Sequence, residues 1–347
     1  MPKTERYKII EELQKERGSL VITYITSTRL NFEAQIAFDA IRIIYDHLIL
    51  NNANKNKTKI DLFLHSNGGD SVVPWRLVTL LREYCKKLTV LIPHKAYSAA
   101  TLIALGADEI IMHPMGIMGP VDPTVTNIFN PTNPANPNQI LGISVEDVSS
   151  YINLIKEDVG IHHEDELIQA FNILANKVHP LALGNVKRFM VQSRMMAKKL
   201  LELHMGKSDD EHKINDIVDN LTSKLYYHAH PINRNEAKSL GLKVIKPPIL
   251  IENLLWKLYL EYEAEMLMDK PFMPLTELFN QDPNFNIGMQ INDYKIVALP
   301  LFKSVYIESL NGTNIYTNDL HLIISRTNCF NYQTNFIIKK QAWEIES

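Results

Sequence analysis

The 347-residue sequence is poor in cysteine and has no long apolar run, and both absences restrict the kind of protein it encodes. Cys85 and Cys329 are its only cysteines. They lie far apart and form no CxxC pair, so we expect neither a disulfide framework nor a cysteine zinc site, and we predict a reducing compartment. No uncharged apolar run of about 18 residues occurs, and the charged N-terminal segment lacks the pattern of a secretion signal. We therefore expect a cytoplasmic protein with no integral membrane segment.

An excess of charge of one sign is also missing. The sequence has 36 Lys and Arg residues against 39 Asp and Glu residues, a net charge of -3, and no basic stripe stands out. Because nucleic-acid binders carry such stripes to neutralise phosphates, no nucleic-acid partner is expected. Apolar residues make up 46% of the sequence, which is ample for a folded core.

Strand-like and helix-like segments alternate in the first third of the sequence. β-rich segments occupy residues 20–26, 60–65, 88–93 and 109–112, and helical patterns occupy residues 32–50, 72–85 and 98–105. This alternation predicts an α/β fold with a mainly parallel sheet and right-handed crossovers.

The later sequence changes character twice. Residues 123–140 are rich in proline and asparagine, which predicts an extended surface loop. Several helical patterns follow at 144–225, and a further helix is expected near 250–268. Because Pro247 and Pro248 separate these parts, we predict a core domain at 1–248 and a helix with a β-rich extension at 249–347.

Two polar features follow neighbouring predicted strands, at the sheet edge where open α/β folds place their sites. One is 66-SNGGD-70, whose paired glycines, Gly68 and Gly69, let the backbone approach another group closely. The other is Ser98, at a strand-to-helix turn, where the N–H of Ala99 lacks a helical acceptor and would stabilise negative charge. These residues alone leave two interpretations open: a helix cap and a tight turn, or a nucleophile beside an oxyanion hole.

Four motifs together carry a resemblance to a known superfamily. SNGGD, AYSAATLIALGADEIIMHP, GIMGPVDP and the distal NRNEAKSLGLKV resemble the Clp protease proteolytic subunit, signal peptide peptidase A and crotonase superfamily. Most closely the sequence resembles the serine dehydrogenase proteinase family of signal peptide peptidase A-like serine peptidases. The likeness spans about residues 6–245. It implies a spiral of β-β-α units for the core domain, to which the helical segment and the small C-terminal β-rich extension are additions.

The resemblance also implies an activity. Ser98 would be the nucleophile, with the backbone N–H groups of Gly69 and Ala99 as the oxyanion hole. The substrates would be cytosolic peptides or unfolded proteins. Members of the superfamily form rings or stacks, and the helices at 144–225 carry more apolar surface than a single sheet needs, so a homo-oligomer is expected.

A serine nucleophile needs a general base, and the sequence offers several. Residues 120–122 stand where Clp-type enzymes place their histidine, and none of them is a histidine. Signal peptide peptidase A relatives use a lysine instead, and Lys156 is the best positional match. His228 and His230 flank the position of the Clp-type aspartate and are alternative bases. We expect His94, four residues before Ser98, to shape the wall of the site.

Other features lead to weaker expectations. The cluster of histidines and acids at residues 162–166 fits no zinc pattern, so neither a metal nor another cofactor is expected. Arg29, at a predicted strand end, is a candidate for binding a substrate carboxylate. Two alternatives to a serine peptidase stay open: a crotonase-type acyl-CoA enzyme and a catalytically degenerate peptide-binding scaffold. Ser98 favours the peptidase, since the crotonase pattern commonly has glycine at that position.

Overall fold

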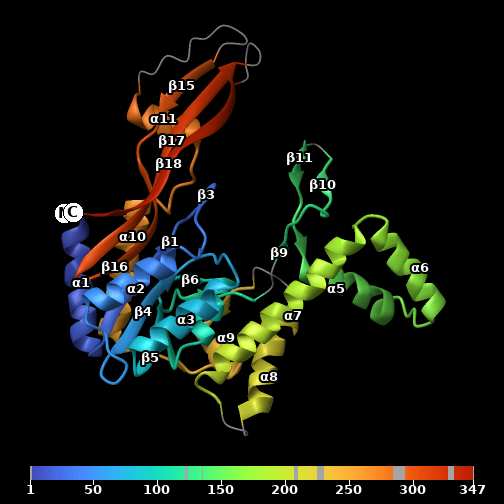
Figure 1. Cartoon of the computed structure of the whole chain (residues 1–347), viewed down its shortest axis with the longest axis horizontal. Helices are drawn as coiled ribbons and strands as arrows, with labels where there is room; N and C mark the ends of the chain where they lie inside the picture. Colours follow the sequence, from blue (N-terminus) through green and yellow to red (C-terminus); the bar gives the residue numbers. More distant parts are fainter. Residues whose placement is uncertain are drawn as a thin grey trace.

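The computed structural model describes residues 2–121, 124–134, 136–206, 210–224, 230–283, 294–326 and 332–346. Its centre is a nine-stranded sheet in the order β14-β7-β5-β4-β1-β16-β17-β15, with β18 paired to β17 (Figure 1). The parallel half consists of β1 (Leu20–Thr26), β4 (Lys59–His65), β5 (Lys87–Ile92), β7 (Glu109–Met112) and β14 (Val244–Ile245). The α/β fold class and the parallel sheet predicted from the sequence are therefore confirmed.

Helices cover both faces of this sheet. On one face lie α2 (Ala40–Leu50), α3 (Val73–Tyr84) and α4 (Ala99–Leu105); on the other lie α1 (Pro2–Arg17) and α10 (Ile249–Met266). The alternation of side chains along β1 explains the two layers: Ile22 packs against the first group, whereas Val21 and Ile25 pack against the second. Every β1 residue after Leu20 is buried, as expected for a strand covered on both faces.

The helix predicted over residues 32–50 is wrong in its first part. Helix α2 begins only at Ala40, whose N–H donates to Asp39 Oδ1 at 3.0 Å. Before it, β3 (Phe32–Glu33) pairs with β2 (Thr28–Arg29), and Ile36 forms a parallel bridge with Gly69. The apolar spacing of this segment suited a helix, but its backbone hydrogen bonds are made to other parts of the chain.

A second, small sheet lies beside the main one. It consists of β6 (Lys95–Ala96), β8 (Ile117–Met118) and β13 (Ile232–Asn233). Strand β5, strand β6 and helix α4 follow one another as one β-β-α unit, which matches the predicted spiral. The loop expected at 123–140 contains short strands after all: β10 (Thr132–Asn133) pairs with β11 (Asn136–Ile140), and β9 (Thr124–Val125) pairs with β12 (Ile143–Ser144).

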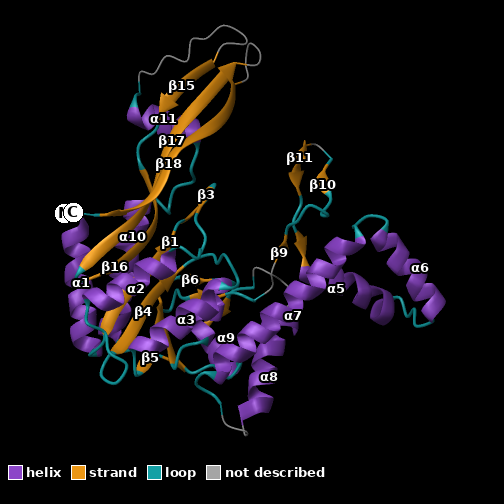
Figure 2. Cartoon of the chain, viewed as in Figure 1, coloured by secondary structure: helices purple, strands orange, loops and turns teal. Residues whose placement is uncertain are grey.

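The predicted helices between residues 144 and 225 are α5 (Val145–Asn153), the π-helical turn η1 (Leu154–Asp158), α6 (Glu164–Ala175), α7 (Pro180–Glu202), α8 (Glu211–Asp219) and the second π-helical turn η3 (Asn220–Lys224). The first three and the beginning of the long α7 form an arm that extends away from the sheet (Figure 2), whereas α8, η3 and the end of α7 pack against the core. The C-terminal part of α7 packs on α4, whereas α6 buries none of its residues. In the described ranges, no helix is both long and apolar enough to cross a membrane.

The C-terminal residues extend the central sheet. After α9 (Arg234–Ser239) and α10 come α11 (Pro274–Gln281), β15 (Tyr294–Ala298), β16 (Phe302–Ser309), β17 (Gly312–Arg326) and β18 (Tyr332–Ile345). Strand β16 pairs antiparallel with β1, so segments from both sides of residue 248 share one sheet. The division into 1–248 and 249–347 stays a prediction about sequence segments.

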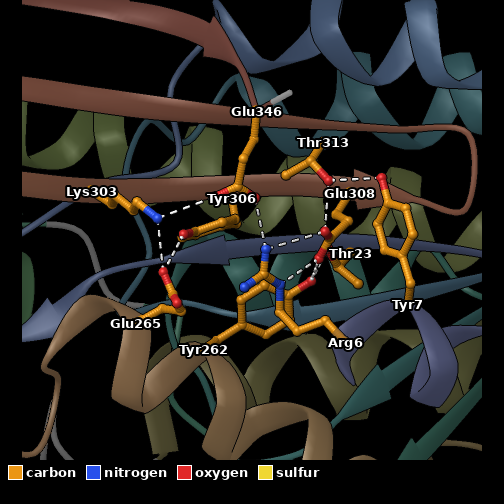
Figure 3. Close-up of polar contacts among 10 residues, drawn as sticks. All are labelled: Arg6, Tyr7, Thr23, Tyr262, Glu265, Lys303, Tyr306, Glu308, Thr313 and Glu346. Carbon is orange, nitrogen blue, oxygen red and sulfur yellow. Dashed lines mark hydrogen bonds and ion pairs between the residues drawn. The ribbon is translucent and has the colours of Figure 1, made fainter. Parts of the chain in front are cut away.

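A buried polar network joins the two ends of the chain (Figure 3). Arg6 of α1 donates through Nε to Glu308 Oε2 of β16 at 2.9 Å, and neither side chain is exposed. Tyr262 of α10 donates to the same carboxylate at 2.5 Å, and Thr313 of β17 donates to it at 2.6 Å. Helices α1 and α10 therefore converge with the hairpin of β16 and β17 on one carboxylate.

Arg29 does not have the role expected from the sequence. Its side chain is buried and forms an ion pair with Glu277 of α11, and its Nε donates to the Lys270 carbonyl at 2.9 Å. The guanidinium also lies over the rings of Phe272 and Phe302. It fastens α11 to the sheet and is not available to a substrate carboxylate.

Candidate active site

The glycine turn after β4 is fastened to the segment that carries Ser98. The N–H of Ser66 donates to the Lys95 carbonyl at 2.9 Å, and the N–H of Tyr97 donates to the Ser66 carbonyl at 3.0 Å. Ser66 and Ala96 thus form a parallel bridge. The two sequence motifs, 30 residues apart, are in contact at the carboxyl edge of the parallel sheet.

Glycine is required at both positions of the pair for steric reasons. Gly68 has φ +106° and Gly69 has φ +155°, which side chains disfavour. A Cβ on Gly68 would lie 2.9 Å from Ser98 Cβ, and one on Gly69 would lie 2.3 Å from the Ile36 carbonyl oxygen. The pair is therefore held between Ile36 on one side and Ser98 on the other.

Ser98 adopts a backbone conformation that is rare for a residue with a side chain, φ +51° and ψ -111°. Such strain costs on the order of 1–3 kcal/mol and is concentrated at functional sites. Although Ser98 is the N-cap residue of α4, its hydroxyl makes no capping hydrogen bond, and the side chain is half-buried. The interpretation of Ser98 as a simple capping serine therefore does not fit this structure.

Two backbone N–H groups beside Ser98 have no acceptor among the described residues: those of Gly69 and Ala99. Their neighbours are occupied, since Gly68 N–H donates to Ser66 Oγ at 2.9 Å and Ala100 N–H donates to the Tyr97 carbonyl at 2.9 Å. Unused, preorganised N–H groups of this kind stabilise an oxyanion. The arrangement suits acyl transfer through the serine hydroxyl.

The candidate bases lie in different surroundings. Lys156 is exposed and belongs to η1 of the arm, which follows α5. His228 lies outside the described residues. His230 Nε2 lies 2.7 Å from Glu236 Oε1, so this imidazole has a carboxylate partner.

The small sheet joins the strands next to Ser98 and His230. Met118 of β8 is paired with Ala96 of β6 on one side and with Ile232 of β13 on the other. Ser98 lies two residues after β6, and His230 lies two residues before β13. Because β13 runs antiparallel to β8 and β6 runs parallel to it, both residues lie beyond the same end of this sheet.

Histidines near the site pack against α10. His94 stacks on His65 with ring centroids 5.6 Å apart, and its Nδ1 lies 2.9 Å from the Tyr259 hydroxyl. Burial lowers the pKa of His94 to about 4 and that of His65 well below its ordinary value. The rings are therefore neutral near pH 7, and the expectation that His94 shapes the wall of the site stays a prediction. The described residues contain no group of three or more metal-ligating side chains, and residues 162–166 form none.

Two contributors to the site were missed from the sequence. Ile36 supports the glycine pair through its backbone, since its N–H donates to the Gly68 carbonyl at 2.8 Å and its carbonyl accepts from Asp70 N–H at 2.9 Å. The helical pattern assigned to this segment concealed that role. Glu236 was missed as a partner of His230, although it stands in the distal motif that supported the resemblance.

Comparison with known proteins agrees with this geometry. Residues 2–141 match the family of ClpP-like SDH-type serine proteinases, which confirms the resemblance inferred from the motifs and supports a serine peptidase. The matched range contains Gly69, Ser98 and Ala99 and ends before Lys156 and His230. Two relatives are the uncharacterized proteins MJ1495 and MJ0137 of Methanocaldococcus jannaschii. They are 28% and 29% identical over 243 and 242 residues, covering 69% of this chain in each case and 71% and 73% of the relatives.

Similar solved structures include two mutants of a membrane-bound stomatin-specific protease, one of them in complex with a substrate peptide. Their sequence identities are 15% and 16%, their TM-scores are 0.35 and 0.36, and the matches cover 67% of this chain and 82% and 77% of those chains. At such scores neither structure assigns a role to any residue of this chain.

Proposed function

We propose that this protein is a serine peptidase that cleaves peptides or unfolded proteins in the cytoplasm through a Ser98 acyl-enzyme. The observation that supports it is the strained Ser98, whose hydroxyl does not cap α4 and lies beside the N–H groups of Gly69 and Ala99, which have no acceptor among the described residues. Ser98 Oγ would attack the peptide carbonyl carbon while its proton passes to a base. The two N–H groups would stabilise the oxyanion. The C–N bond would then break, the base would protonate the leaving amine, and water would hydrolyse the ester.

A fluorophosphonate probe tests the nucleophile. We expect covalent labelling of the wild-type protein at Ser98, mapped by peptide mass spectrometry, because the probe reacts with activated serine hydroxyls. Ser98→Ala should lose the label, whereas the control Ser149→Ala, on the arm, should keep it. Labelling of Ser98→Ala at the wild-type level would refute the assignment. An unlabelled wild-type protein would favour the crotonase-type or scaffold alternatives.

For the general base we favour His230 over Lys156. His230 lies beyond the same end of the small sheet as Ser98 and is paired with Glu236, the arrangement in which a carboxylate orients an imidazole. Ser98 Oγ and His230 share no hydrogen bond among the described residues, and catalytic hydrogen bonds of this kind often tighten only when substrate binds. Lys156 is on the arm, so a role for it would require the arm to approach the serine.

Substitution of each base separates the two assignments. We expect His230→Gln to lower kcat/KM by about 100-fold or more, since general-base catalysis contributes about 100- to 10,000-fold. Glu236→Gln should cause a smaller loss and shift the acidic limb of the pH profile, because the carboxylate acts through the imidazole. Lys156→Met should leave kcat/KM unchanged. The reverse pattern, with Lys156→Met inactive and His230→Gln active, would assign the base to Lys156.

We also propose a homo-oligomer that assembles through the arm. Helix α6 buries no residue, and Ile168 and Phe171, which are three positions apart and therefore share one face, are 58% and 46% exposed. An amphipathic helix with an uncovered apolar face gains stability by packing against another surface. We expect light scattering to give a multimer for the wild type and a smaller species for Phe171→Glu. An unchanged mass for Phe171→Glu would exclude α6 from the contact.

A further inference from the structure

A cavity of about 300 Å³ lies where the C-terminal strands meet the segment before α2. One wall is formed by residues 32–35, Ala37 and Asp39, and the other by side chains of β16, β17 and β18. The second wall comes from the part of the chain beyond the 2–141 family match. Neither the nucleophile nor its oxyanion hole lines this cavity.

The charged groups in the cavity are all acidic. Glu33 and Asp39 line it, and no lysine, arginine or histidine does. Among the described residues, neither carboxylate forms an ion pair with a cation. Glu33 Oε1 accepts only the N–H of Asn31 at 3.3 Å, and Asp39 Oδ2 accepts the indole N–H of Trp343 at 2.8 Å. Both residues are exposed, and their two carboxylates attract a cationic group to the mouth of the cavity.

Two amide side chains of the cavity wall are oriented by hydrogen bonds. Asn318 uses its Nδ2 to donate to Ser304 Oγ at 2.7 Å, and Gln341 uses its Nε2 to donate to Asn318 Oδ1 at 2.7 Å. These two bonds fix the orientation of both amides, and they leave Gln341 Oε1 without a donor among the described residues. An amide oxygen beside carboxylates suits a ligand that only donates, such as a guanidinium or an ammonium group.

Two aromatic rings complete the wall. Tyr316 and Trp343 meet edge to face, with centroids 5.4 Å apart and an interplanar angle of 72°. Both side chains are partly buried, and Trp343 is held by its hydrogen bond to Asp39. The face of an indole or phenol ring attracts a cation, and arginine most often takes this position. Acidic, acceptor and aromatic groups therefore all favour the same class of ligand.

Ile36 and the glycine pair connect the cavity wall to Ser98. Its wall residues Gln35 and Ala37 flank Ile36, whose backbone binds Gly68 and Asp70. Gly68 in turn contacts Ser98. A peptide bound at Ser98 in an extended form advances about 3.3 Å per residue, so a side chain a few residues away can enter the cavity.

We propose that this cavity binds an arginine or lysine side chain of the peptide that Ser98 cleaves. The proposal rests on the proposed function, since it makes the cavity a substrate subsite. Glu33 supplies charge at the rim, Trp343 supplies a ring face, and Gln341 supplies an oriented acceptor. The C-terminal extension thereby contributes to substrate selection.

The test measures peptide binding to Ser98→Ala, which cannot form an acyl-enzyme, by fluorescence anisotropy at constant salt. The probes are three labelled alanine-based peptides that are identical except for a central arginine, citrulline or norleucine. Citrulline keeps the shape of arginine and removes its charge. We expect the arginine peptide to bind at least about 10-fold more tightly than the other two.

Adding Glu33→Gln should reduce the preference for arginine several-fold, whereas the control Glu12→Gln, on α1, should keep it. Equal binding of the three peptides, or an equal preference in the two variants, would overturn the proposal. Free arginine that competes at the same concentration as the arginine peptide would assign the cavity to a small molecule and overturn the substrate role. If the wild-type protein cleaves all three peptides equally, the subsite proposal is wrong and the peptidase assignment stands. If the arginine preference holds but Ser98 is neither labelled nor active, the peptidase assignment fails instead.

Discussion

Gly69→Ala should leave a folded protein that has lost peptidase activity by about 100- to 1,000-fold, the loss typical of one oxyanion donor. A Cβ at this position would lie 2.3 Å from the Ile36 carbonyl oxygen and 2.5 Å from its nitrogen. Both are backbone atoms in hydrogen bonds, so the glycine pair has to move. Moving it displaces the Gly69 N–H from the position where the oxyanion would form. The measurement is kcat/KM on a fluorogenic peptide, together with a thermal unfolding curve.

The matched control is Gly18→Ala. Gly18 also has a positive φ, +59°, but nothing lies within 4 Å of a Cβ built there. This variant should lose a modest amount of stability from backbone strain and keep full activity. If Gly69→Ala retained wild-type kcat/KM, or if Gly18→Ala lost as much activity, the role of Gly69 in the oxyanion hole would be refuted.

Glu308→Ala should have the largest effect on stability, lowering the free energy of unfolding by about 3–5 kcal/mol, the cost of breaking a buried ion pair by removing one partner. Neither Arg6 nor Glu308 is exposed, and the same carboxylate also accepts hydrogen bonds from Tyr262 and Thr313. Among the described residues, its removal leaves the buried guanidinium with one acidic hydrogen-bond partner, Glu346 at 2.9 Å. The measurement is urea unfolding followed by circular dichroism.

Two further variants make this result interpretable. Glu5→Ala removes the acid of an exposed ion pair with Lys8 on the same helix and should change the free energy of unfolding by less than about 1 kcal/mol. The double variant Arg6→Met, Glu308→Leu should recover much of the loss, because no uncompensated charge stays buried. A loss for Glu308→Ala no larger than that for Glu5→Ala would show that the network contributes little.

Much of the fold could be predicted from local pattern. The strands and helices between residues 20 and 112 follow hydrophobic periodicity. Because strands alternate with helices along this segment, they are expected to form a parallel sheet. The prediction failed at residues 32–38, where apolar spacing was helical but Ile36 is bonded to the glycine turn. It also missed the strands within residues 123–140, because proline and asparagine mark turns without excluding the short hairpin between them.

Some residues of the candidate site could likewise be predicted from the sequence, and others could not. Ser98, Gly69 and Ala99 could be proposed from the sequence, since a glycine pair and a serine at a helix start have narrow chemical uses. The sequence alone determined an α/β chain and directed attention to Ser98 and the glycine turn. Only the tertiary structure decided that Ser98 does not cap its helix, that His230 has a carboxylate partner, that Arg29 is buried, and that the C-terminal strands share a sheet with β1. The reason is physical: local pattern depends on neighbours along the chain, whereas strand register, ion pairs and strained dihedrals are fixed by contacts between residues far apart in sequence.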